Sequence, residues 1–359
     1  MKYRNVELLA SESIAVAGTK VVDVNVADPI SRISVRVKLT NATTDPVGHP
    51  LKALKKIELV DGADVLFSLT GQQAAAHGFY WTKEQPAFMM DYMNVEYCMA
   101  LADAYFGRRL WDPMYAVDPK KHTNLQLKIE HDKALGGNTP TAGSIEVRAD
   151  VFDELDVDPK GFMLTKEHYR YTQVANDIKY VDLPTDWPIV LLMFGAHDTT
   201  EGPEYNVTHI KLTEDHDKSI ILEGDMEDLL LHYSHQFPKW TESFYGYHDA
   251  GAAQNFWISP TWERNGALIN AENTNGTGSW TLSAGQVLAI ILETAGTFSA
   301  IVSGHYPFGQ FPIFMGDKDT DEDWWNGRHV TSKRFRLTEA AGPDVSELMR
   351  VAMTQARQY

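Results

Sequence analysis

The sequence contains one structural unit twice, at a fixed interval. Residues 57–80 are matched by residues 210–233, which lie 153 positions later. Each copy has a short strand of the pattern Ile-x-Leu, a polar turn, a second β-rich run, a glycine and a helix-like segment that ends in tyrosine. The two glycines, Gly71 and Gly224, keep the same interval. A repeat of this length predicts two copies of one domain, and chance similarity of turn residues is the alternative explanation.

A further pair of segments keeps the interval. Residues 142–145 read Ala-Gly-Ser-Ile, and residues 295–298 read Ala-Gly-Thr-Phe. Each segment precedes an apolar run, so the two segments are predicted to begin corresponding strands in the two copies.

Alternation of apolar and polar residues predicts β-strands along most of the chain. Residues 30–39 and 145–151 place apolar side chains at every second position, and residues 189–194 form a continuous apolar run. Alternation is typical of a half-buried strand, and a continuous run is typical of a strand buried on both faces. Turn residues separate these segments, which predicts an all-β sandwich or barrel. The 359 residues allow two such domains of roughly 150 residues each.

The same pattern divides the chain into five segments. Apolar residues at helical spacing over 343–358 predict a C-terminal helix. The predicted segments are an N-terminal arm at 1–28, a first β-domain at 29–155, a linker at 156–179, a second β-domain at 180–315 and a C-terminal tail with the helix at 316–359.

The charge distribution bears on possible partners. The net charge of −17 argues against a surface that coats nucleic acid, because phosphate binding needs clustered Lys and Arg. Both termini are nevertheless basic, so the chain has an acidic body with basic ends. The basic residues near the ends include Lys2, Arg4, Lys333, Arg334, Arg336, Arg350 and Arg357.

The single cysteine, Cys98, excludes an internal disulfide framework and fits synthesis in a reducing cytoplasm. Apolar neighbours predict that it is a buried small hydrophobe. The N-terminus has no apolar core of the kind that marks a signal peptide, and no apolar run approaches twenty residues. We therefore expect no membrane-spanning segment.

Sequence patterns for catalysis and metal binding are weak. Asp317, Asp319 and Asp321 begin like a calcium loop, but Glu322 stands where such a loop has glycine and Arg328 where it has a bidentate glutamate. A calcium site and a solvated acidic loop both remain open. The thirteen histidines show no metal-ligand spacing, and the phosphate-loop and nucleophile-elbow motifs are missing. No catalytic residue and no cofactor is predicted.

Aromatic residues gather between positions 240 and 262, where Glu242, Asp249 and Glu263 accompany them. Such a cluster could stack on sugar rings, or it could anchor a subunit interface. The adjacent Trp324 and Trp325 could likewise form an interface or membrane-proximal anchor, or a lid packed over one end of the domain. The interface candidates are Trp240, Phe244, Tyr245, Trp257, Trp262, Trp324 and Trp325.

Several motifs together resemble one known family. They are Ile-Glu-Leu at 57–59 with Ser-Leu-Thr-Gly at 68–71, Tyr-Phe-Gly-Arg-Arg-Leu-Trp-Asp at 105–112, Asn-Leu-Gln-Leu-Lys-Ile at 124–129 and Tyr-Val-Asp-Leu-Pro at 180–184. On two tandem β-domains, this order resembles the double jelly-roll major capsid proteins of tailless icosahedral viruses, including membrane-containing bacteriophages. The acidic tract at 317–323 and a long insertion at 81–95 depart from the family pattern.

This resemblance implies both a fold and a function. Each β-domain would be an eight-stranded antiparallel jelly roll with short helices. The chain would be a structural protein without catalysis that forms pseudo-hexagonal homotrimers, because three chains of two rolls place six similar units around a ring. Its partners would be other copies, neighbouring capsomers, and minor capsid and penton proteins. Both termini would face an internal lipid membrane or the genome at the capsomer base, without sequence-specific nucleic-acid binding.

Functions of a different class remain open at this stage, and among them a bicupin oxygenase is disfavoured by the missing metal-ligand pattern. Paired β-sandwiches also serve carbohydrate-binding and carbohydrate-cleaving proteins. A hydrolase would need two carboxylates that converge in a cleft, and Glu242, Asp249 and Glu263 are available for that role. A capsid subunit would instead be located in the virion shell after synthesis in the host cytoplasm.

Overall fold

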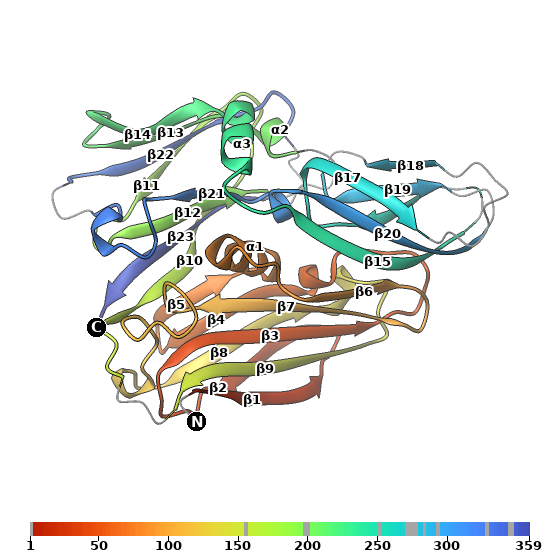
Figure 1. Ribbon diagram of the computed structural model, residues 1–359, viewed down its shortest axis with the longest axis horizontal. Coiled ribbons are helices and arrows are strands. Elements are labelled where there is room, and N and C mark those ends of the chain that lie inside the picture. Colours follow the sequence, from red (N-terminus) through yellow and green to blue (C-terminus); the bar gives the residue numbers. More distant parts are fainter. Residues whose placement is uncertain are drawn as a thin grey trace.

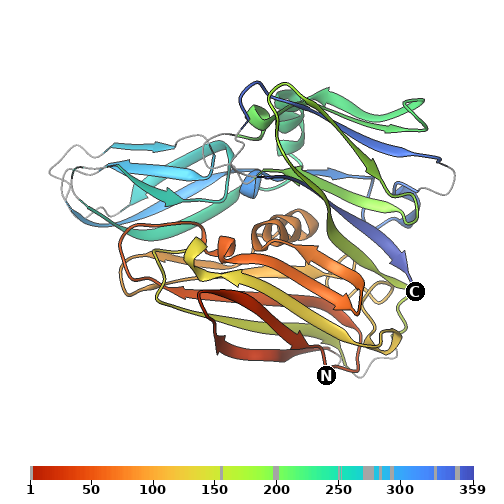
Figure 2. The ribbon, with the colours of Figure 1, turned by 180° about the vertical axis from the view of Figure 1, so that it is seen from behind.

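The computed structural model describes residues 3–153, 157–196, 202–249, 251, 253–269, 279–282, 285–291, 295–326, 330–343 and 348–359. β-Strands dominate it, and they form two stacked bodies with a third, smaller body at one end (Figures 1 and 2). No helix in these ranges is long and apolar enough to cross a membrane.

The first body is a jelly roll of two four-stranded layers. One layer has the order β1-β9-β3-β7 and the other has the order β2-β8-β4-β5. Their inward side chains form one apolar core beneath alternating polar outer positions. The strands are β1 (Tyr3–Ser13), β2 (Ala17–Asp23), β3 (Ile30–Thr40), β4 (Leu54–Asp61), β5 (Asp64–Leu69), β7 (Tyr97–Tyr105), β8 (Leu125–Asp132) and β9 (Ala142–Phe152).

The second body repeats this topology strand for strand. Its layers have the orders β10-β23-β12-β21 and β11-β22-β13-β14. Each strand therefore has a counterpart in the first roll, and the predicted pair of eight-stranded jelly rolls is confirmed. The strands are β10 (Gly161–Thr172), β11 (Ile178–Leu183), β12 (Ile189–Gly195), β13 (Val207–Glu214), β14 (Ser219–Asp225), β21 (Phe311–Phe314), β22 (Lys333–Glu339) and β23 (Leu348–Gln358).

The duplicated unit found in the sequence is duplicated in three dimensions. Strands β4 and β13 begin and end 153 positions apart, and the pattern of buried and exposed positions along them is identical. A β-bulge interrupts their pairing with β5 and β14 at the same step, after Leu59 in one roll and after Leu212 in the other. The helices that follow, α1 (Gly71–Thr82) and α3 (Met226–Ser234), also correspond.

One eight-stranded sheet contains strands of both rolls, because β5 pairs in parallel with β10. The other eight-stranded sheet joins the first roll to strands outside both rolls, because β6 (Phe88–Tyr92) pairs in parallel with β15 (Trp240–His248). Between α3 and β21 lies an insertion that forms the smaller body at the right of Figure 1. Its further strands are β16 (Gln254–Trp257), β17 (Trp262–Ile269), β18 (Ser279–Leu282), β19 (Val287–Ile291) and β20 (Gly296–His305).

Short helices fill the connections. The longest, α1, lies between the two rolls, while α3 covers the second roll on its outer side (Figure 1). The remaining elements are α2 (Pro203–Asn206) and the 3-10 turns η1 (Pro50–Ala53), η2 (Pro119–Lys121), η3 (Lys133–Leu135), η4 (Pro307–Gly309) and η5 (Asp321–Asp323).

The structure corrects the predicted secondary structure of three segments. The predicted arm at 1–28 contains β1 and β2, and the predicted linker at 156–179 contains β10 at the centre of a sheet. The predicted C-terminal helix is wrong, because its described part is strand β23, paired on both sides with β10 and β12. A central strand is buried on both faces, so its continuous apolar residues also match helical spacing.

The second predicted correspondence is also wrong. Ala142 opens β9, but residue 295 precedes β20, which lies in the insertion and pairs with β15 and β17. The counterpart of β9 is β23, because each pairs with the first long strand of its roll, β3 or β12. Strands β22 and β23 therefore complete the second roll and are not a tail beyond residue 315.

Candidate functional site at the junction of the two rolls

Helix α1 forms the centre of the junction. Thr70 caps its first turn, and a reciprocal bond with Gln73 satisfies the free backbone amides there. All residues from Gly71 to Trp81 are buried, because one face packs on the first roll and the other on the outer face of β23. Such complete burial makes α1 part of a permanent contact between the rolls.

Three side chains of α1 make polar contacts across or beside the junction. His77 Nε2 lies 3.0 Å from Thr354 Oγ1, and the Tyr80 hydroxyl donates a hydrogen bond of 2.7 Å to the Gln310 carbonyl. Trp81 Nε1 donates to the Gly107 carbonyl at 2.9 Å. Burial lowers the pKa of His77 to about 3, so the imidazole is neutral at physiological pH.

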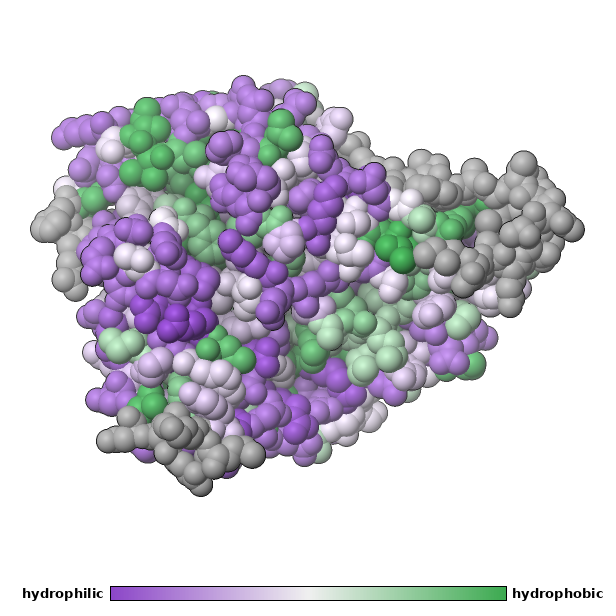
Figure 3. Space-filling view, viewed as in Figure 1, coloured by the Kyte–Doolittle hydropathy of each residue, from purple (hydrophilic) through white to green (hydrophobic). Residues whose placement is uncertain are grey.

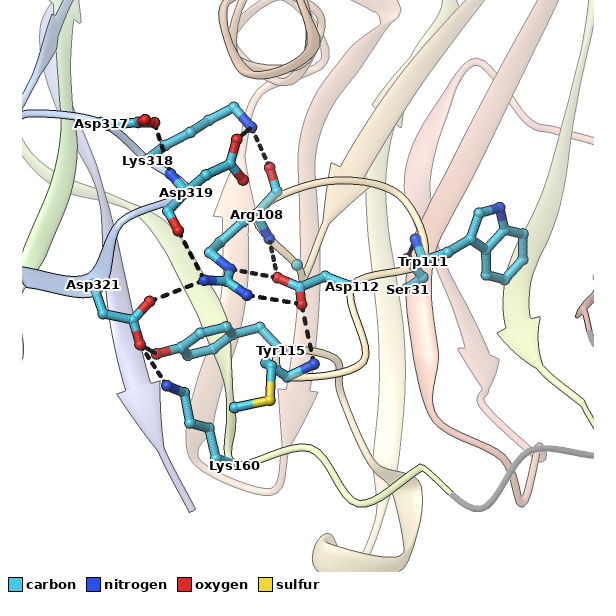
Figure 4. A network of polar contacts seen from close by, with 12 residues as sticks. Ser31, Arg108, Trp111, Asp112, Tyr115, Lys160, Asp317, Lys318, Asp319 and Asp321 are labelled. Carbon is cyan, nitrogen blue, oxygen red and sulfur yellow. Dashed lines mark hydrogen bonds and ion pairs between the residues drawn. The ribbon is translucent and has the colours of Figure 1, made fainter.

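A second polar network joins the loops at one end of the rolls (Figure 4). Arg108 pairs with Asp112 at 2.7 Å in the first roll and reaches Asp321 of the second at 3.1 Å. The hydroxyl of Tyr115 donates to Asp321 at 3.0 Å, and Lys160 pairs with the same carboxylate. Burial disfavours charge on Asp112, but the hydrogen bonds from Arg108 outweigh it and lower the pKa of this carboxyl.

The calcium candidates belong to this network. Asp321 accepts hydrogen bonds from the cations described above, while Asp317 accepts one from the backbone amide of Asp319 at 3.0 Å. Lys318 Nζ lies 3.4 Å from the Asp319 carboxylate. Among the residues that the structure describes, no group of three or more His, Cys, Asp or Glu side chains is arranged to hold a metal ion. Arg108 and Lys160 face Asp321, Lys318 faces Asp319, and a backbone amide faces Asp317.

The aromatic candidates are mostly internal. Trp240 and Phe244 lie in apolar cores, and Trp324 and Trp325 are buried as well. Trp257 and Trp262 are half-buried. Tyr245 is the one of the seven whose side chain is mainly exposed, at 59%. Sequence alone could not separate these cases, because aromatic cores and aromatic interfaces use the same residues.

Glu242 also lies inside the protein. Its carboxylate accepts hydrogen bonds of 2.7 Å from both the backbone and the hydroxyl of Ser259, and one of 3.1 Å from Trp240 Nε1. Burial raises the pKa of this carboxyl. Since its oxygens are occupied by internal donors, Glu242 does not face a cleft as a glycoside hydrolase requires.

His49 completes a Ser-His-Glu trio with Ser259 and Glu242, but the arrangement is structural. The amide of Leu51 donates to His49 Nδ1 at 3.2 Å, so Nε2 carries the proton and lies 3.3 Å from the Ser259 hydroxyl. A general base would need a free lone pair there. Burial lowers the pKa of His49 to about 3. The trio links the first roll to the insertion.

Most of the described basic candidates have partners within the chain. Arg4 pairs with Asp28 at 2.7 Å, and Arg334 pairs with Asp182 at 2.9 Å. Lys333 is buried over Trp325, which lowers its pKa to about 8 through desolvation. The remaining positions are Arg350 (2.6 Å from Glu167), Arg357 (2.6 Å from Asp64), Arg336 (half-buried on β22) and Lys2 (outside the described residues).

Cys98 is buried, as its apolar neighbours predict, and burial raises its pKa to about 12. The sequence patterns did not identify the junction network. Its one visible signal is the Arg-Arg-Leu-Trp-Asp motif at 108–112, which entered only as part of the family resemblance.

Solved structures of other proteins share this fold, although their sequences differ. No protein-family model matches the sequence, and no curated protein sequence matches it. The major capsid protein of Sulfolobus turreted icosahedral virus superposes with a TM-score of 0.62 at 9% identity, over 100% of this chain and 98% of that one. The fold is that of the double jelly-roll major capsid proteins.

Two further solved structures agree. The major capsid protein P2 of bacteriophage PM2 superposes with a TM-score of 0.52 at 10% identity, over 99% of this chain and 98% of that one. A PBCV-1 virus capsid protein gives 0.53 at 9% identity, over 98% and 92% of the two chains. The double jelly-roll likeness extends over almost the whole of this chain, including the strands at both termini.

Proposed function

We propose that this chain is a major capsid protein, the structural subunit of an icosahedral viral shell. The observation that carries the proposal is the repeated strand order. Each roll arranges its eight strands in two four-stranded layers, and the order within the layers is the same in both rolls. A chain with two equivalent rolls gives six similar units when three copies form a ring, and such a ring tiles a flat facet. Its likeness to three viral capsid proteins over nearly the full length supports this function.

The partners follow from this role. We propose a homotrimeric capsomer that contacts neighbouring capsomers and minor capsid and penton proteins. The location is the virion shell, after synthesis in the host cytoplasm, which suits the free thiol of Cys98. At the junction, His77 Nε2 and the Tyr80 hydroxyl form hydrogen bonds with neighbours within the chain, which suits a structural role without catalysis.

The arrangement of the termini supports an orientation. Both termini lie in the half of the molecule away from the insertion (Figures 1 and 2). The termini would face the capsomer base, toward an internal membrane or the genome, and the insertion would face outward. This orientation rests on position, because Arg4, Arg350 and Arg357 are neutralised within the chain.

The carbohydrate alternative receives no support from the aromatic cluster, since Trp240, Phe244 and Glu242 are buried. The test is the mass of purified chain by light scattering, together with negative-stain imaging. Trimers that form hexagonal arrays or shells are expected. A folded monomer at all concentrations, with a thermal shift on addition of sugars, would overturn the capsid proposal.

A further inference from the structure

The two copies of the duplicated unit differ in what covers them. In the first roll, β5 pairs in parallel with β10, where Phe67 lies opposite Thr165, and α1 is buried by the second roll. In the second roll, β14 pairs with β13 alone among the described strands, and α3 is covered on one face only. The second unit therefore presents an open edge and an open helix face.

Corresponding positions on β5 and β14 differ in how far their side chains are buried. The common bulge fixes the alignment, so Phe67 corresponds to Leu222 and Leu66 corresponds to Ile221. Leu66 is fully buried, whereas Ile221 is 44% exposed and its neighbour Ile220 is 52% exposed. Hydrophobic side chains gather at the surface over β14 at the upper left of Figure 3. An exposed apolar edge strand is a site for pairing with another chain.

Helix α3 shows the same relationship. Its N-cap, Asp225, corresponds to Thr70 of α1, so His232 corresponds to His77. His77 is buried against Thr354, but His232 and the preceding acidic residue Asp228 are exposed. Leu231 is 61% exposed on the same helix.

The surface that α1 contacts also has a counterpart. Strand β1 pairs with β9 as β10 pairs with β23, and each pairing starts opposite the last residue of the second strand, with Tyr3 opposite Phe152 and Gly161 opposite Gln358. In this register, Glu7 corresponds to Thr165, and Arg148 corresponds to Thr354. The outer edge of β1 is unpaired among the described strands, and its side chains are largely exposed.

We infer that β14 and α3 of one copy of this chain dock onto β1 and β9 of a second copy, as β5 and α1 dock onto β10 and β23 within the chain. The inference rests on the proposed capsomer and names its contact. Leu222 then lies beside Glu7 of the next copy in a parallel pairing. Asp228 and His232 lie over Arg148 of that copy.

The chemistry of the two surfaces fits this contact. Within the chain, α1 covers uncharged positions of β23 such as Thr354, which suits a contact that forms during folding. Between copies, a carboxylate on α3 meets Arg148, whose side chain is 43% exposed and also pairs with Glu7 and Glu146 of its own chain. Charged contacts suit the association of chains that are already folded.

The positions of the two surfaces decide the symmetry. Strand β14 lies at the top of Figure 1 and β1 at the bottom, so one copy does not make this contact with itself. Two different patches form a heterologous interface, which closes into a ring or continues as a filament. Closure after three copies gives the proposed capsomer.

A cross-link in the full-length chain tests the contact. Glu7→Cys combined with Leu222→Cys is expected to give disulfide-linked dimers and trimers on non-reducing gels, because parallel neighbours lie within disulfide reach. Native Cys98 is buried and does not compete. Glu7→Cys combined with Ile178→Cys, an exposed residue on the opposite edge strand β11, is the matched control and is expected to stay monomeric on the gel.

Assembly measurements give a second, independent reading. Ile221→Asp is expected to raise the concentration at half-assembly by about tenfold or more, while Val174→Asp, at another exposed apolar residue, leaves it unchanged. Asp228→Arg and Arg148→Glu are each expected to weaken assembly, and the double variant to recover it. Unchanged melting temperatures of the unassembled variants show that folding is intact.

The outcomes separate the two proposals. If the chain forms trimers, but the cross-link yield equals the control and Ile221→Asp has no effect, this contact is wrong while the capsid proposal stands. If the folded chain stays monomeric at every concentration, both are overturned.

Discussion

His77 in the first roll and Thr354 in the second form a hydrogen bond of 3.0 Å in the interior of the chain. Thr354 Oγ1 also lies 2.9 Å from Thr165 Oγ1, so the helix, the central strand β23 and the connecting strand β10 share one polar chain. His77 stacks on Trp81 at 5.3 Å between ring centroids. This cluster links the two rolls through buried polar and ring contacts.

Truncation at this cluster tests its contribution to stability. His77→Ala removes a buried ring and its hydrogen bond, and we expect a loss of about 2–4 kcal/mol in the free energy of unfolding. His232→Ala, at the matched exposed position of α3, is expected to change it by less than about 0.5 kcal/mol. Denaturant melts of the unassembled chain measure both. Equal effects of the two substitutions would contradict a structural role for the junction helix.

Acid is expected to destabilise the fold through His49 and His77. Burial lowers both pKa values to about 3, compared with 6.5 for an exposed imidazole. Between these values the unfolded chain binds protons that the folded chain does not. Stability is therefore present above pH 6.5 and is lost as the pH falls toward 3, by up to about 1.4 kcal/mol per pH unit for each histidine.

The measurement is the pH dependence of the unfolding free energy from pH 7 to pH 4. Carboxylates also titrate in this range, so the informative quantity is the difference in slope between the wild type and His77→Gln. We expect the variant to show the shallower slope. An identical slope would mean that His77 is protonated in the folded state.

The sequence predicted the fold best where the duplicated unit is uninterrupted. The interval of 153 holds for β4 and β13, but it grows to 155 for β5, α1 and their counterparts, because the turn after β13 is two residues longer than the turn after β4. Gly71 therefore does not correspond to Gly224, although the sequence had predicted that it would. The interval fails for the last strands, since β9 and β23 begin 206 positions apart once the insertion between α3 and β21 intervenes. The assumption of a constant interval therefore wrongly matched Ala142 with residue 295, which lies in the insertion.

The contacts of individual side chains could not be read from the sequence. Basic residues near both termini indicated a positive base, but Arg350 and Arg357 meet Glu167 and Asp64, which lie far away in the chain. Trp240 and Tyr245 lie an odd number of positions apart on β15, so they point to opposite faces, but alternation alone does not tell which face is buried. Both outcomes require the three-dimensional arrangement of the strands.

The network of Figure 4 is expected to contribute to stability through Asp112, whose side chain is fully buried. Arg108→Ala leaves that carboxylate without its cation, and we expect a loss of about 3–5 kcal/mol. The neighbouring Arg109 is exposed, so Arg109→Ala is the matched control and is expected to cost less than about 0.5 kcal/mol. Thermal melts compare the two. A small effect of Arg108→Ala would show that another group compensates Asp112.

Gly309 holds the insertion against the second roll. Its φ of +67° lies in the left-handed region, and an added Cβ would lie 2.2 Å from the Ala196 carbonyl oxygen. Gly62 has a similar φ of +62°, but open space surrounds its missing Cβ. Gly62→Ala is therefore expected to cost about 1–2 kcal/mol from backbone strain alone. Gly309→Ala adds a clash with backbone that cannot move freely, and we expect it to cost at least twice as much or to prevent folding. Soluble yield and melting temperature distinguish the two variants, and equal effects would show that the backbone around Ala196 adapts.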